Sequence, residues 1–211
     1  MLYAIRKMEN QMRSKEKIVG IYGLLSVFIL ITALLVFGYL NNEFSFVHNF
    51  ISKLGAKGEP NALWFNLVGF VTVGILLSVF GFNYGKLLND KLLAILLSLF
   101  GLGFAFTAIP IDMQLSNTPV SKAHVVAICF GLAFWFFGLS RLGYNEQLKR
   151  KVRNRANITA VLLVLSLIGF VFGFWSMPVT HRLVFGIVFG WTALTSTELI
   201  FKGNETKIKT A

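Results

Sequence analysis

Residues 18–40 read IVGIYGLLSVFILITALLVFGYL, a run of 23 residues without a charge. About 20 mainly apolar residues are enough for a helix to cross the hydrocarbon core of a bilayer. The run lacks the small-residue cleavage pattern of a secretory signal, so we interpret it as a retained span. Comparable runs occupy residues 62–82, 92–109, 123–140, 158–177 and 183–201. The sequence therefore predicts an all-α integral membrane protein, a bundle of six transmembrane helices over residues 18–201.

The composition of the chain excludes an ordinary water-soluble domain. Its 211 residues are 55% hydrophobic and 14% charged, whereas charged residues make up about a quarter of a typical soluble domain. Cys129 is the single cysteine of the sequence, which excludes a disulfide within the chain and a cysteine metal set.

Lysine and arginine indicate the orientation in the membrane. Sixteen of them fall in the N-terminal segment, the loops after the second and fourth runs, and the C-terminal tail; four fall on the other side. The excess of positive charge marks the cytoplasmic side, so both termini are expected in the cytoplasm and the chain in the cytoplasmic membrane. The net charge of +11 then reflects topology and attraction to anionic lipids rather than a nucleic-acid partner, because the basic residues are spread over four membrane-flanking segments.

The two ends of the chain are expected to lie outside the bilayer core. Residues 1–17 place apolar and basic side chains at helical spacing, which predicts a cytoplasmic basic amphipathic segment along the inner leaflet; a disordered tail is the alternative. Residues 202–211 are expected to form a cytoplasmic tail. Glu198 precedes Lys202 by one helical turn, so we expect an exposed ion pair between them.

Glycines spaced four residues apart predict a close contact between the last two spans. Gly169 and Gly173 lie in the fifth predicted span, and Gly186 and Gly190 lie in the sixth. Small residues let helices approach closely in a membrane, where no hydrophobic driving force acts between them. We therefore expect a tight antiparallel hairpin around a turn at residues 178–180.

Polar and ionisable residues gather on the outer side of this topology. Unpaired polar groups at membrane depth are costly, so several at one level predict a shared polar pocket open to the outer leaflet. The alternative is that each residue caps its own helix in the headgroup zone. The residues are His48, Ser52, Asn66, Asp112, His124, His181 and Arg182.

Binding of a lipid-like or amphiphilic molecule is the function that this pocket favours. Arg182 at the start of the last span would hold an anionic group. Asp112 and His124 would form a hydrogen-bonded pair, and Ser52 and Asn66 would orient the headgroup. Membrane lipids are the expected partners.

Two other functions are left open. The first is an intramembrane lipid hydrolase with His124, Asp112 and Ser52 as catalytic candidates. Zinc could be held by His48, Asp112, His124 and His181, since histidine and aspartate are zinc ligands, but no helix-spaced histidine pair is present and no cofactor is predicted. The second is a structural or partner-binding subunit, which could be a homo-oligomer.

The order of several short motifs resembles a known family. They are Ser52-Lys-Leu-Gly55, Asn66-Leu-Val-Gly69 leading to Gly74, Ile109-Pro-Ile-Asp112 followed by His124, and Arg182 opening the last span. This set is similar to the DUF998 family of six-span prokaryotic membrane proteins. The resemblance implies the six-span fold and a role for Ser52, Asp112, His124 and Arg182, and it implies no particular activity. The family commonly has an acidic residue before the final arginine, where this chain has His181.

Overall fold

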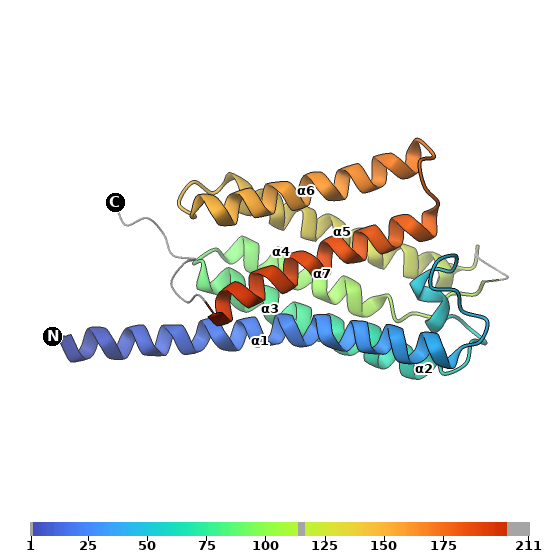
Figure 1. Ribbon diagram of the computed structural model, residues 1–211, viewed down its shortest axis with the longest axis horizontal. Coiled ribbons are helices and arrows are strands. Elements are labelled where there is room, and N and C mark those ends of the chain that lie inside the picture. The colour runs from blue at the N-terminus through green and yellow to red at the C-terminus, as the bar shows by residue number, and fades with distance from the viewer. Residues whose placement is uncertain (1, 114–116, 202–211) are drawn as a thin grey trace.

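The computed structural model describes residues 2–113 and 117–201, and all regular structure in these ranges is helical (Figure 1). The long helices run roughly along one axis of the molecule. The elements are α1 (Leu2–Leu40), the 3-10 helix η1 (Ile51–Gly55), α2 (Ala62–Phe65), the π-helical segment η2 (Asn66–Thr72), α3 (Val73–Leu87), α4 (Lys91–Phe106), α5 (Pro119–Tyr144), α6 (Arg150–Val171) and α7 (Met177–Phe201).

The long helices contact one another in a closed ring, in the order in which they follow along the chain. The neighbours are α1 with α3, α3 with α4, α4 with α5, α5 with α6, α6 with α7, and α7 with α1. The aromatic side chains of Phe80, Tyr84, Trp135 and Trp191 meet inside this ring, where Trp191 packs edge-on against the other three. The loops after α1, α4 and α6 lie together at one end of the bundle, opposite the end where α1 begins (Figure 1).

The lengths and composition of the helices confirm a helical membrane protein. Within the described residues, five helices are long and apolar enough to cross a membrane, and large apolar side chains such as Phe28, Phe130 and Leu194 lie exposed on the outside of the bundle. Such an apolar exterior needs lipid around it. The third predicted span corresponds to α4, an apolar helix of 16 residues that ends at Phe106. The five long segments are Asn10–Leu40, Ala62–Leu87, Pro119–Tyr144, Arg150–Val171 and Met177–Phe201.

The N-terminal segment is continuous with the helix of the first span. Residues 2–40 form one continuous helix, so the basic residues before position 18 extend the first span along its own axis (Figure 1). The sequence between Leu2 and Val19 contains neither glycine nor proline, which explains why the helix has no break there. The predicted tail at 202–211 lies outside the described residues.

Glycines produce close helix contacts, although at other pairs of helices than predicted. Between α3 and α4, a side chain at Gly85 would collide with the backbone of Ala94. Between α1 and α7, a Cβ atom at Gly20 would come within 2.6 Å of the carbonyl oxygen of Ser196. The first contact brings α4 close to α3, and the second brings α7 close to α1.

The predicted glycine contact between α6 and α7 is wrong. Within the part of the chain that the structure describes, a side chain at Gly186 or Gly190 would meet no atom within 4 Å. The fifth span also ends earlier than predicted, because Gly173 adopts a φ of 74° just after Val171 and the chain turns before α7 starts at Met177. The ring of Trp175 then covers Gly169, whose Cβ position it occupies.

Candidate functional site

The polar residues predicted for the outer side do lie at one end of the bundle, where they bind to backbone groups. Arg182 at the start of α7 donates from Nε to the carbonyl of Phe46, from Nη1 to that of Pro178 at 2.7 Å, and from Nη2 to that of Asn49 at 2.7 Å. A charged donor that bonds to loop carbonyls fixes the loop on the helix. Arg182 therefore ties the loop between α1 and η1 to α7.

Asn66 and His124 make the same kind of contact with other loops. The amide of Asn66, in η2, donates to the carbonyl of Gly55 at 2.9 Å, and the Nδ1 atom of His124, in α5, lies 2.9 Å from the carbonyl oxygen of Ile109. Both side chains are buried. They connect the two loops that contain Gly55 and Ile109 to the helical bundle.

Asp112 and Ser52 lie in the loops themselves. The carboxylate of Asp112 is 3.7 Å from the amine of Lys57, and its backbone N–H donates to the hydroxyl of Ser121 at 3.1 Å. Ser52 is half-buried in η1. The contacts described for Arg182, Asn66, His124 and Asp112 thus connect the loops at this end to one another and to the helices.

The predicted metal ligands are spread over this end of the bundle. His48 is exposed in the first outer loop, while the ring of His181 packs on Phe50 with 5.0 Å between ring centroids. Among the described residues, no group of three histidine, cysteine or acidic side chains could hold a metal ion. The carboxylate of Asp112 lies near the amine of Lys57, and the ring of His124 contacts the carbonyl of Ile109.

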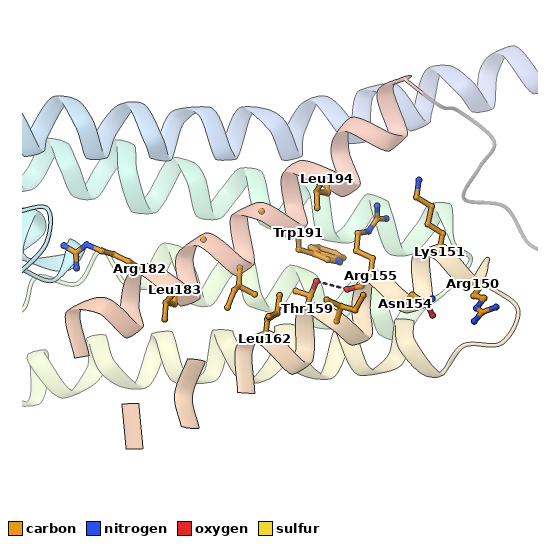
Figure 2. Close-up of a pocket in the computed structure, with 14 residues that line it drawn as sticks. Arg150, Lys151, Asn154, Arg155, Thr159, Leu162, Arg182, Leu183, Trp191 and Leu194 are labelled. Carbon is orange, nitrogen blue, oxygen red and sulfur yellow. Dashed lines mark hydrogen bonds between the residues drawn. The ribbon is translucent and has the colours of Figure 1, made fainter. Parts of the chain in front are cut away.

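A groove lies between α6 and α7 on the surface of the bundle. It has a volume of about 900 Å³ (Figure 2). Gly186 and Gly190 of α7 leave the space that side chains would otherwise fill. Apolar side chains form most of the walls: Ile158, Leu162, Leu183, Ile187, Trp191 and Leu194. The groove can therefore accommodate an apolar chain that lies between two helices.

Charged residues line the two ends of this groove. Arg182 lies at one end in Figure 2, and Arg150, Lys151 and Asn154 lie at the other, where α6 begins. Arg155 also lines the groove near this second end.

An ion cluster joins α6 to α7 near the start of α6. Glu198 accepts a hydrogen bond from Nη1 of Arg155, and its other carboxylate oxygen lies 2.5 Å from the amine of Lys151. The side chain of Glu198 is 6% exposed and that of Arg155 is 14% exposed, whereas Lys151 is 60% exposed. The buried carboxylate thus has one sheltered and one exposed cationic partner.

This cluster corrects the expected environment of Glu198. We expected Glu198 to be exposed, and this prediction is wrong, because its side chain is buried and pairs with two residues of α6. Its expected partner Lys202 lies outside the described residues. A signal was present in the sequence. An antiparallel hairpin brings the beginning of its first helix beside the end of its second, and Arg155 and Glu198 lie in these two places.

Comparison with known proteins places the chain in a family. The sequence profile of DUF998, described as a protein of unknown function, matches residues 24–201. The chain belongs to the DUF998 family. No match is found among curated proteins or among solved structures. The resemblance of the motifs to DUF998 is confirmed, and the function of this DUF998 protein must be argued from its geometry.

The chemistry of the groove in this DUF998 protein is that of binding. Its walls offer apolar area for a hydrocarbon chain, and its end at the start of α6 offers guanidinium and ammonium groups for anions or polar headgroups. The end of the bundle that holds Arg182 is different, since the described contacts of Arg182, Asn66 and His124 are directed at backbone carbonyls.

Proposed function

We propose that this protein binds a membrane lipid or similar amphiphile in the groove between α6 and α7. The observation that carries the proposal is the combination of apolar walls, two open glycine positions and basic residues at the groove's ends. An apolar chain would lie along the walls, and a polar headgroup would bind at an end. The outer polar residues, including Ser52 and Asp112, would hold the loops in place beside this site.

We further propose six spans, with α4 as the third, and both termini in the cytoplasm. The distribution of Lys and Arg supports this orientation. A six-span bundle also suits the ring of helix contacts, since α4 packs between α3 and α5 over its length. A helix of 16 residues with a 1.5 Å rise is about 24 Å long, so slight local thinning of the bilayer or the short turn at residues 107–109 would complete the crossing. The membrane would be the cytoplasmic membrane.

Filling the groove tests the proposed function. We would purify the parent protein in a mild detergent and measure retained lipid by native mass spectrometry. The same measurement would be made on a double variant that carries both Gly186→Leu and Gly190→Leu. A Cβ atom at either position would meet no atom of another part of the described chain within 4 Å, so the new side chains should occupy the groove without distorting the helices. We expect the double variant to lose most of the retained lipid.

A matched control separates filling of the groove from a general change in the apolar surface. Val125→Leu and Val126→Leu enlarge two exposed side chains on α5, outside the groove, and should leave retention unchanged. Melting temperatures of all variants report whether the fold is intact. Equal lipid retention in the parent and the folded glycine variant would overturn the proposal.

A further inference from the structure

The end of the groove at the start of α6 carries excess positive charge. Three cationic side chains line it, Arg150, Lys151 and Arg155, and Glu198 is the carboxylate that pairs with two of them. The three cations and one carboxylate leave a net charge of +2 beside an apolar channel. A neutral headgroup would not balance this charge, whereas an anionic headgroup would.

The direction of α6 adds to the positive potential at the same place. The first turn of α6 contains Arg150, Lys151 and Arg153 and no acidic residue, and Lys149 precedes it. A helix N-terminus carries a partial positive charge and favours anions, so basic residues in the first turn are opposite to the usual preference. An anion bound near Arg150 and Lys151 would relieve this repulsion.

We infer that the occupant of the groove is an anionic phospholipid of the cytoplasmic leaflet, with its phosphate at Arg150 and Lys151. This inference rests on the proposed function, because it specifies the ligand of the same groove. Basic pockets between transmembrane helices on the cytoplasmic side are suited to anionic lipid headgroups. Both residues belong to the side that the charge distribution assigns to the cytoplasm, so the headgroup would lie at the level of the inner leaflet.

The position of Lys151 explains how it could serve the headgroup and the protein together. Its amine is 2.5 Å from Glu198 and its side chain is 60% exposed, so it reaches from the buried carboxylate to the surface of the groove. Figure 2 shows Arg150 and Asn154 near the same end. From there an acyl chain would pass Ile158 and Leu162 toward the open space at Gly190.

The test compares two lipids that differ in headgroup charge. Delipidated protein in a neutral detergent is titrated with dioleoyl-phosphatidylglycerol or dioleoyl-phosphatidylcholine, and bound lipid is counted by native mass spectrometry. The parent should bind the anionic lipid more tightly. Each basic residue near a membrane surface contributes about a fivefold effect on binding to anionic lipid, so Arg150→Gln and Lys151→Gln should each weaken phosphatidylglycerol binding about fivefold. Arg150→Lys should restore most of the loss.

A basic residue away from the groove supplies the control. Lys86 of α3 lies over the ring of Phe82, at the end of a helix that does not line the groove. Lys86→Gln should therefore leave the preference for phosphatidylglycerol intact. The inference is overturned if Lys86→Gln removes this preference as strongly as Arg150→Gln, or if Arg150→Gln and Lys151→Gln leave the preference unchanged.

The failure of this inference can be told apart from the failure of the proposed function. One outcome is that both lipids bind the parent equally while the double variant of Gly186→Leu and Gly190→Leu binds neither. In that case the groove binds lipid regardless of headgroup charge, and only the inference fails. If the glycine variant binds both lipids as the parent does, the proposed function fails and the inference with it.

Discussion

Breaking the ion cluster between α6 and α7 should destabilise the protein, and the loss of Glu198 should cost more than the loss of Arg155. In Glu198→Met, the guanidinium of Arg155 loses its carboxylate while 86% of its side chain stays buried, because it is 14% exposed in the parent. Removing one partner of a buried ion pair costs about 3–5 kcal/mol. In Arg155→Met, the carboxylate of Glu198 keeps the amine of Lys151 at 2.5 Å, so the loss should be smaller.

The double variant Glu198→Met with Arg155→Met should recover most of the stability. Two apolar side chains of similar volume replace the buried pair, and such replacements are often neutral or stabilising. Thermal unfolding in detergent is the assay. For a chain of this length, 1 kcal/mol corresponds to about 2–4 °C, so Glu198→Met should melt about 6–20 °C below the parent.

Glu146 provides the control for the loss of a carboxylate. It is exposed in the loop between α5 and α6, and Glu146→Met should change the melting temperature by only a degree or two, as about 0.5 kcal/mol would. The reasoning is refuted if Glu198→Met melts with the parent, or if the double variant is as unstable as Glu198→Met alone.

Three further outcomes test other parts of the structure. Gly85→Val should lower the melting temperature, because its side chain collides with backbone and overpacking costs about 1–3 kcal/mol, whereas Gly190→Ala should melt with the parent. Arg182→Ala should speed hydrogen exchange in residues 45–50, measured by mass spectrometry, since each lost charged hydrogen bond is worth about 1.5–3 kcal/mol; unchanged exchange there would show that Arg182 does not hold this loop. Asn66→Leu should lower the melting temperature by leaving a buried carbonyl without its donor, at a cost of about 1–3 kcal/mol, and an unaltered melting curve would argue against that bond.

The sequence was sufficient to predict the membrane-embedded helical fold. Uncharged runs locate the long helices, and the first run ends at Leu40, where α1 ends too. The turn between α6 and α7 was misplaced, because hydropathy does not register the positive φ of Gly173 that ends α6 within an apolar run. That error also shifted the level at which residues of the two helices were expected to meet.

The candidate site was predictable only in part. The polar residues predicted for the outer side lie at one end of the bundle, yet partners such as the carbonyl of Phe46 for Arg182 are backbone groups that carry no sequence signature. The groove was not predicted, since glycine spacing alone cannot distinguish a close contact from an open one. Gly23 lies against Ser196, while Gly190 faces open space.

Mapping the position of a bound lipid tests the central claim most directly. The protein would be placed in bilayer nanodiscs that contain phosphatidylglycerol with a photoactivatable acyl chain, and the crosslinked residues would be identified by mass spectrometry. We predict that crosslinks concentrate on groove residues such as Leu162, Ile187 and Leu194. Crosslinks spread evenly over these residues and the exposed face of α5, for example Val125 and Phe130, would contradict a lipid site between α6 and α7.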